Sequence, residues 1–467
     1  MVLANSTYFV FLTAIFLLYW PLSRWRAASL AVLLFANYFF YAKWDLFYLG
    51  LIPAASFCDY LIGRALGRAA RGWLRRSLVA LSVLLNLAIL ASFKYMPFLL
   101  ASWSGATGRP APEWHWSFPL GISFYCFQSL TYTIDVYRRD GQPVRSLLAH
   151  MAAVSFFPTT LSGPITRVLA LAPQMEKAGR GLPDGDAGRG LFRIGLGLAK
   201  KFLIADYLAD NLVNRVFDTP GLYTATETLI GVYGYTVQLY YDFSGYTDIA
   251  IGSALLLGLK LPENFNRPYE AQNIAEFWRR WHISLSNWLR DYLYFSLPGL
   301  RSKWKAFTYF NLFLTMLLGG LWHGANWTFV VWGALHGAAL AVQHGWRTAR
   351  GQKTLRGWRR LGPALLTSHY VMFAWIFFRA TSLENAREVL ERLLSATVSF
   401  ANITPGIAAV LGVGMAAQFL PRRWYEFSRD RFAAAPFYAQ AACLAGLAAA
   451  IEYVAATGAA PFLYTQF

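Results

Sequence analysis

The chain of 467 residues has 56% hydrophobic and 17% aromatic side chains but only 14% charged ones. An ordinary soluble domain has roughly 25% charged residues, so this composition argues against a soluble globular protein and predicts extensive contact with lipid. The formal net charge is +18. Because the basic residues form short clusters between apolar runs, as in cytoplasmic loops, we expect contact with membrane lipid and no nucleic-acid partner.

Apolar runs predict the helices. A membrane-spanning helix needs about 20 mostly apolar residues, because the hydrocarbon layer is ~30 Å thick. About ten to twelve segments are candidates, some of them short or re-entrant. In chain order they are residues 8–22, 30–41, 46–62, 77–100, 118–137, 147–165, 226–259, 306–322, 327–343, 363–378, 405–420 and 437–454. We expect the first segment to be a retained span, since it lacks a basic leader. Without repeats or linkers, residues 1–467 are predicted to form a single domain.

The basic clusters predict the orientation of the spans, since such clusters favour the cytoplasm. They lie at residues 64–76, 138–145, 347–360 and 422–431. Alternation of direction then places both termini on the periplasmic side. Acidic and basic residues spaced by four within 384–392 predict a short helix on the outer surface. Hydropathy does not assign residues 167–201, which mix basic residues with glycine and proline.

The first candidate for chemistry is His323, in LLGGLWHGANWTFVVWGALHG (residues 317–337). Polar residues inside membrane segments are costly, so each is a functional candidate. The basic flanks predict a hairpin with Trp322, His323 and Gly324 at its turn, and Gly319, Gly320 and Gly324 allow close approach of a backbone or a substrate. A neutral imidazole there could act as a general base. The alternative is a histidine satisfied by an interhelical hydrogen bond.

The second candidate is His282, in FWRRWHISLSNWLRDYLY (residues 277–294). Its spacing predicts a helix at the cytoplasmic interface with Trp278, Trp281, His282, Leu285, Trp288 and Leu289 on one face. Tryptophans would lie in the headgroup belt, leaving Arg279 and Arg280 free to bind the phosphates of a donor such as coenzyme A. The alternative is an aromatic and basic belt that only anchors the protein to lipid.

Other residue patterns give weaker signals. Asp242 and Asp248 are six residues apart, which separates them around a helix, so a structural role is expected. His336 and His344 are expected to pack on helix faces. The cysteines Cys58, Cys126 and Cys443 have neither metal-site nor disulfide spacing. The sequence has no motif of a serine hydrolase, P-loop ATPase or zinc protease, and we expect no metal.

The two histidine segments together resemble the membrane-bound O-acyltransferase family, in its bacterial branch of alginate O-acetyltransferase membrane subunits. Residues 118–138, 155–167 and 241–269 are similar to the same branch, so the resemblance spans nearly the whole chain. It implies about eleven transmembrane helices, with re-entrant or interfacial helices, around a central funnel or tunnel in the bacterial inner membrane. It places His323 at the catalytic histidine position and His282 at the second signature position.

The resemblance also implies a reaction and its partners. Acetyl-CoA would supply the acetyl group from the cytosol, bound near Arg279, Arg280 and Trp281, with Trp322 or Asn326 as oxyanion or tunnel residues. A periplasmic partner of the serine-esterase type would acetylate a polysaccharide such as alginate or cellulose. The C-terminal PFLYTQF matches an F-x-Y-x-x-F pattern found in related D-alanylation systems. Tyr464 would then relay the acyl group, or the tail would be an aromatic anchor.

Two alternatives remain open at this point. The same chemistry could serve another acceptor, peptidoglycan above all. A non-enzymatic transporter could also have many spans and buried histidines, although it would be expected to show paired halves with broken helices.

Overall fold

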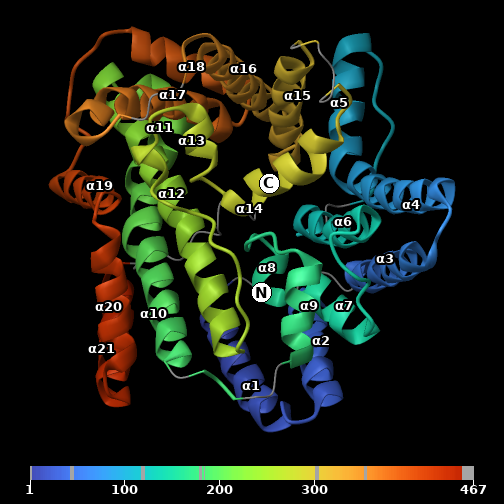
Figure 1. Cartoon of the computed structure of the whole chain (residues 1–467). Coiled ribbons are helices and arrows are strands. Elements are labelled where there is room, and N and C mark those ends of the chain that lie inside the picture. The colour runs from blue at the N-terminus through green and yellow to red at the C-terminus, as the bar shows by residue number, and fades with distance from the viewer. Residues whose placement is uncertain are drawn as a thin grey trace. The chain divides into compact units, whose positions relative to one another are not determined.

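The computed structural model describes residues 3–42, 47–116, 121–177, 181–183, 185–299, 304, 306–351 and 355–454. The secondary structure of these residues is helical, without strands, so the predicted all-α class is confirmed. The chain forms two compact units, and their helices are labelled in Figure 1. Unit 1 comprises Met1–Ile194, Tyr246–Pro262 and Asp430–Ala435, and unit 2 comprises Gly195–Gly245, Glu263–Arg429 and Pro436–Phe467. That both belong to a single functional domain stays a prediction.

Unit 1 contains the N-terminal helices. They are α1 (Ser6–Leu22), α2 (Arg26–Ala42), α3 (Leu51–Arg68), α4 (Gly72–Leu90), α5 (Met96–Thr107), α6 (Ile122–Arg138), α7 (Leu147–Val154), α8 (Phe157–Thr160) and α9 (Val168–Lys177). The unit also holds most of α10 (Asp186–Leu198) and the end of α12 (Ala225–Leu256). Hydropathy left residues 167–201 unassigned; α9 and α10 lie there.

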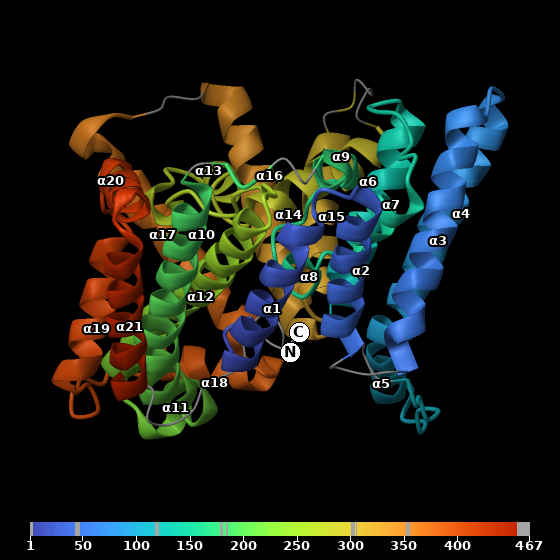
Figure 2. The ribbon, with the colours of Figure 1, turned by 90° about the horizontal axis from the view of Figure 1, so that it is seen from below.

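A buried carboxylate joins three helices of unit 1. Asp59 on α3 accepts hydrogen bonds from Ser82 (2.5 Å) and Asn86 (2.9 Å) of α4 and from Ser129 (2.5 Å) of α6. Figure 2 shows α3 and α4 side by side. Because buried polar groups are costly unless they are bonded, this network specifies how the three helices pack.

One predicted span of unit 1 is interrupted. Residues 147–165 were expected to form one segment, but α7 ends at Val154 and α8 begins at Phe157. Asn37 of α2 stabilises the break, because its side chain donates to the Ala152 carbonyl (3.0 Å) and accepts from the Phe157 amide (2.9 Å). The expectation of one continuous helix was wrong because the Asn37 side chain, from another helix, bonds to backbone groups that the break leaves without helical partners.

Unit 2 contains the remaining helices. Two π-helical segments, η3 (Ala199–Asp206) and η4 (Ala209–Val213), lead to α11 (Asn214–Asp218), the short η5 (Pro220–Leu222) and α12. There follow α13 (Ile274–Trp278), α14 (Ile283–Trp288), η7 (Leu289–Leu293), α15 (Ala306–His323), α16 (Trp327–Arg350), η9 (Gly357–Arg360), α17 (Leu361–Arg379), α18 (Leu383–Leu394), α19 (Pro405–Ala417), α20 (Arg422–Ala434, whose end belongs to unit 1) and α21 (Phe437–Val454).

The surface helix predicted within residues 384–392 is confirmed as α18. The Ser382 side chain caps its N-terminus by accepting from the Asn385 amide (3.1 Å), as such caps commonly do. Arg387 forms ion pairs with Glu384 and with Glu391 (2.9 Å). Arg392 instead donates to the carbonyl groups of residues 220 and 221.

The predicted hairpin around His323 is also confirmed, because α15 ends at His323 and α16 begins at Trp327. Glycines let the two helix backbones touch. A methyl group on Gly333 would lie 2.6 Å from the Met316 carbonyl oxygen, and one on Gly337 would lie 2.8 Å from the Phe313 carbonyl oxygen. Small residues permit this close approach.

Three helical stretches among the described residues are long and apolar enough to cross a membrane: Gly72–Thr107, Gly357–Arg379 and Phe437–Val454. Shorter apolar helices are Ser6–Leu22, Arg26–Ala42, Leu147–Thr160 and Pro405–Ala417. The expected number of about eleven spans therefore stays a prediction.

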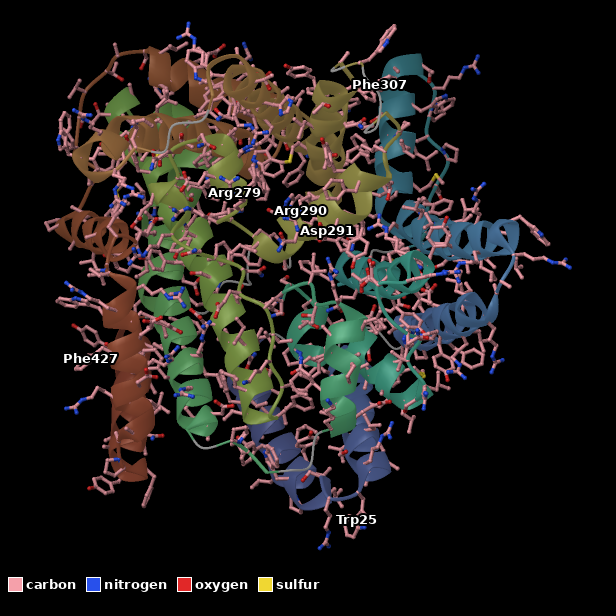
Figure 3. All side chains as sticks on the ribbon, in the orientation of Figure 1. Trp25, Arg279, Arg290, Asp291, Phe307 and Phe427 are labelled. Carbon is pink, nitrogen blue, oxygen red and sulfur yellow. The ribbon has the colours of Figure 1, made fainter. Side chains whose placement is uncertain are left out.

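On α20, Phe427 is 66% exposed and lies at the surface (Figure 3).

We predict that Gly333→Ala lowers the melting temperature of the detergent-solubilised protein. The added methyl group would push against backbone, which does not yield easily, and overpacking of this kind costs about 1–3 kcal/mol. Gly412→Ala is the matched control, since a methyl group at that position of α19 meets no atom within 4 Å. Equal melting temperatures for Gly333→Ala and the wild-type protein would contradict the close contact.

Candidate active site

His323 lies at the C-terminal end of α15 among large aromatic rings, with only 4% of its surface exposed. Its ring centroid is 5.0 Å from that of Trp322, 5.1 Å from that of Trp332 on α16 and 5.2 Å from that of Phe378 on α17. All three contacts are edge-to-face, which is a favoured geometry for aromatic pairs. Three helices therefore fix the position of this imidazole.

His282 lies in the turn between α13 and α14 and is completely buried. The continuous helix predicted across residues 278–289 was wrong, because His282 has a left-handed backbone with φ +41°. Asn264 holds the turn: its carbonyl accepts from the Ile283 amide (2.9 Å), and its side chain accepts from the Ser284 hydroxyl (2.6 Å). These tertiary hydrogen bonds outweigh the local helical pattern.

The turn brings His282 and His323 together, with ring centroids 6.4 Å apart. Phe243 of α12 packs edge-on against His282 at 4.7 Å. Burial lowers the pKa of His282 to about 3, so this imidazole is neutral at physiological pH. Charging it would be costly because desolvation disfavours the cation. The two buried imidazoles therefore lie close together in a largely apolar setting, and imidazole is a side chain that commonly takes part in proton transfer.

The tryptophans next to His282 do not form a headgroup belt, so that expectation was wrong. Trp278, Trp281 and Trp288 are each less than 10% exposed. Trp281 stacks on Phe277 (5.6 Å) and packs against Trp375 of α17 (5.1 Å). Their burial in the core of unit 2 outweighs the usual preference of tryptophan for the lipid interface.

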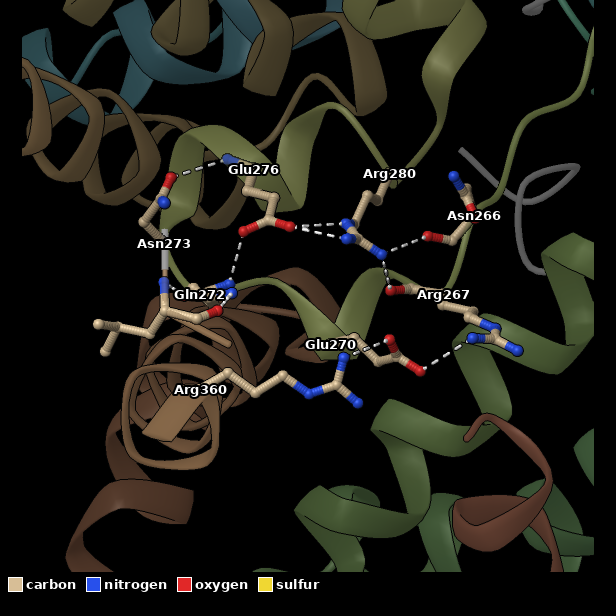
Figure 4. A network of polar contacts seen from close by, with 9 residues as sticks. Asn266, Arg267, Glu270, Gln272, Asn273, Glu276, Arg280 and Arg360 are labelled. Carbon is tan, nitrogen blue, oxygen red and sulfur yellow. Dashed lines mark hydrogen bonds and ion pairs between the residues drawn. The ribbon is translucent and has the colours of Figure 1, made fainter. Parts of the chain in front are cut away.

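The two arginines predicted to bind phosphate differ in their environment. Arg280 donates twice to the carboxylate of Glu276, at 2.7 and 3.0 Å, and also to the carbonyl groups of Asn266 and Arg267. The same polar network includes Glu270, which pairs with Arg267, and Gln272, whose amide donates to Glu276 (Figure 4). Arg279 is exposed (Figure 3), and although its backbone amide donates to the Glu276 carbonyl (3.1 Å), no ion pair or hydrogen bond joins its side chain to another described residue. Arg279 is therefore the better placed of the two to bind an anion.

A comparison with known proteins identifies the class of the protein. The model of the membrane-bound O-acyltransferase (MBOAT) family matches residues 134–384, more than half of the chain, and this range includes both histidines. This chain belongs to the MBOAT family. It is therefore an O-acyltransferase and an integral membrane protein, and it uses an acyl donor, as the resemblance of its motifs implied.

Curated relatives extend the similarity to MBOAT proteins over most of the chain. A probable alginate O-acetylase (AlgI) of Azotobacter vinelandii is 42% identical over 86% of this chain and 79% of its own length. A peptidoglycan O-acetyltransferase of Helicobacter pylori is 35% identical over 78% of this chain and 73% of its own. A teichoic acid D-alanyltransferase of Bacillus subtilis is 31% identical over 56% of this chain and 68% of its own length.

Two further residues predicted for the candidate site lie within three residues of His323 in the sequence. Trp322 is buried and contacts both imidazoles, with ring centroids 5.0 and 6.2 Å away. Asn326 caps α16, accepting from the Thr328 amide (3.1 Å), and donates to the Thr381 carbonyl (3.1 Å). Trp322 thus remains the better placed donor for an oxyanion. Tyr464, the predicted acyl relay, lies outside the described residues.

The sequence patterns missed a buried charge cluster in unit 2. Lys201 of η3 forms ion pairs with Asp206 (2.8 Å) and with Asp242 of α12 (2.7 Å), and all three are less than 10% exposed. The π-helical geometry of η3 could not be read from the sequence, although an ionisable residue in an apolar run was a signal. In unit 1, Asp248 pairs with Arg193 (2.9 Å). Both aspartates thus form buried ion pairs, and the structural role expected for them stays a prediction.

We predict that Lys201→Met strongly destabilises the protein. Removing the positive charge of Lys201 takes an ion-pair partner from two buried carboxylates, and breaking a buried ion pair costs about 3–5 kcal/mol. Thermal unfolding in detergent measures the effect. Arg387→Met, which breaks exposed ion pairs on α18, should change the melting temperature little. An unchanged melting temperature for Lys201→Met would contradict the cluster.

Proposed function

We propose that this protein transfers acetyl groups from cytosolic acetyl-CoA across the inner membrane for the O-acetylation of an exported polysaccharide. One observation carries the proposal: the paired, buried imidazoles of His282 and His323 lie in a chain that is 42% identical, over 86% of its length, to an alginate O-acetylase. A buried polar pair in a membrane protein is costly, so it indicates function.

The relatives favour an exopolysaccharide as acceptor. AlgI proteins of Azotobacter vinelandii and Pseudomonas putida are 42% and 41% identical to this chain. We therefore propose alginate or a similar exopolysaccharide, such as cellulose, as the final acceptor. Peptidoglycan is the second candidate, because the Helicobacter pylori peptidoglycan O-acetyltransferase is 35% identical over 78% of the chain.

In the proposed mechanism His323 is the general base. It removes the proton from an acceptor hydroxyl while the hydroxyl oxygen attacks the thioester carbonyl carbon. The tetrahedral intermediate then breaks its bond to sulfur, and the protonated His323 returns the proton to the departing thiolate. An acyl ester and free coenzyme A result, with no net change in protons.

Neighbouring residues support this base. Edge contacts from Trp322, Trp332 and Phe378 hold the imidazole in one orientation, and a fixed orientation removes an entropic part of the barrier. His282 would bind or orient the reacting groups from the opposite side. The Trp322 indole is the proposed donor to the oxyanion, where a preorganised hydrogen bond has a large effect because water is excluded.

The proposed assembly has a donor side and an acceptor side. On the cytosolic side, Arg279 would bind the phosphates of acetyl-CoA and Trp281 would pack along the path of the thioester. On the periplasmic side, a serine-esterase-like partner would receive the acetyl group. About eleven helices would surround a central tunnel that links the cytosolic and periplasmic sides, and both termini would lie in the periplasm. Tyr464 is the proposed carrier between them.

We predict that His323→Ala lowers acetyl transfer at least ~100-fold, the lower range of the contribution of general acid–base catalysis. The assay follows radiolabelled acetyl groups from acetyl-CoA to alginate oligosaccharides in proteoliposomes that contain the periplasmic partner. His344→Ala is the control, because this histidine contacts Tyr309 and Arg347 near the end of α16. Full transfer by a folded His323→Ala variant would refute the proposed base.

We also predict that Arg279→Gln and Arg280→Gln have different effects. Arg279→Gln should raise the KM for acetyl-CoA roughly 10-fold, since a charge-assisted hydrogen bond contributes about 1.5–3 kcal/mol, and should leave the melting temperature unchanged. Arg280→Gln should lower the melting temperature, because it leaves Glu276 without its cation. Steady-state kinetics and thermal unfolding measure both, and identical profiles for the two variants would contradict this division.

A further inference from the structure

A third buried histidine lies close to the pair. His336 is on α16, one turn after Trp332, and is completely buried. Its ring centroid is 4.8 Å from that of Trp332 and 5.1 Å from that of Trp278 on α13, with Phe277, Tyr370 and Trp375 between 6.2 and 6.4 Å. Rings from α13, α16 and α17 thus enclose the imidazole.

Trp332 is the link between His336 and His323. Its ring is edge-on to His323, at 5.1 Å and an interplanar angle of 89°, and is 4.8 Å from His336 at 63°. Trp375 stacks on the same indole at 5.8 Å and 16°. A change in the position of Trp332 would therefore be felt directly by His323, because close-packed interiors transmit displacements.

The two faces of α16 explain why this link is rigid. Gly333 and Gly337 press the helix against the backbone of α15, while Trp332 and His336 point to the aromatic cage on a different face of the helix. Residues four apart share a face, so each pair forms one contact surface. With one face fixed against α15, packing on the other face decides where the Trp332 ring lies.

The side-chain contacts that the structure shows for His336 are ring contacts. Neither of its ring nitrogens forms a hydrogen bond with another residue of the described chain. Aromatic pairs in edge-to-face contact contribute beyond their buried area, so the planar ring itself is the feature that fixes Trp332.

We propose that His336 is a positioning residue for acyl transfer, holding the Trp332 ring against His323 so that the base keeps its orientation. This inference rests on the proposed function of His323. Misplacement of a reacting group by about 1 Å can lower the rate 100-fold, so the enclosed ring can influence turnover without touching the substrate.

Substitutions at residue 336 test the proposal in the proteoliposome assay. His336→Leu keeps similar bulk but removes the ring, and it should lower kcat ~10- to 100-fold without raising the KM for acetyl-CoA. His336→Phe restores a planar ring and should return kcat to within a few-fold of wild type. His150→Leu is the matched control: this histidine is equally buried but packs against Tyr60 and Tyr132 of unit 1, and kcat should be unchanged.

A double-substitution cycle separates positioning from general destabilisation. If His336 acts through Trp332, His336→Leu should add little further loss in a Trp332→Leu background, since coupled residues are not additive. Full additivity, wild-type kcat for His336→Leu, or equal losses for Leu and Phe would each overturn the proposal. Should His336→Leu fail to fold, His336→Met and His336→Phe provide the same comparison of a flexible chain with a ring.

His323→Ala, measured in parallel, distinguishes the two levels of the hypothesis. Full transfer by His323→Ala would refute the proposed base itself. Inactivity of His323→Ala together with wild-type kinetics of His336→Leu would refute only the positioning role.

Discussion

The close contact between the backbones of α15 and α16 is the constraint on which the candidate site depends. Gly333 and Gly337 leave no side chain between the helices, so the hairpin closes tightly and the turn at its end is held. His323 then meets Trp332 of the second helix at edge-to-face distance. Without that approach the imidazole would lose its contact with Trp332 and keep only those with Trp322 and Phe378.

Much of the fold could be predicted from apolar runs, because lipid and a packed core both require them. Helices α1, α2, α12, α15, α17 and α21 begin and end within a few residues of the predicted segments. The turn at His323 could be predicted because glycines and basic flanks surround it, and α18 because its charges repeat every four residues. In each case the information is local in the sequence.

The missed features depend on residues distant in sequence. The break at His282 is stabilised by Asn264, and the break after α7 by Asn37. A helical pattern does not reveal a side chain from elsewhere that satisfies the backbone. The Lys201–Asp242 ion pair could not be predicted for the same reason, since Asp242 lies on another helix. Arg280, whose phosphate binding stays a prediction, pairs with Glu276 one turn away, a contact that was not read from the sequence.

The left-handed backbone of His282 places two opposed demands on one position. With φ +41° and ψ 55°, the conformation suits glycine or asparagine better than histidine, and such strain costs roughly 1–3 kcal/mol. Selection for thermal stability alone would favour glycine or asparagine here, while the role proposed for His282 requires the imidazole. We therefore expect position 282 to show a trade-off between thermal stability and activity in directed evolution.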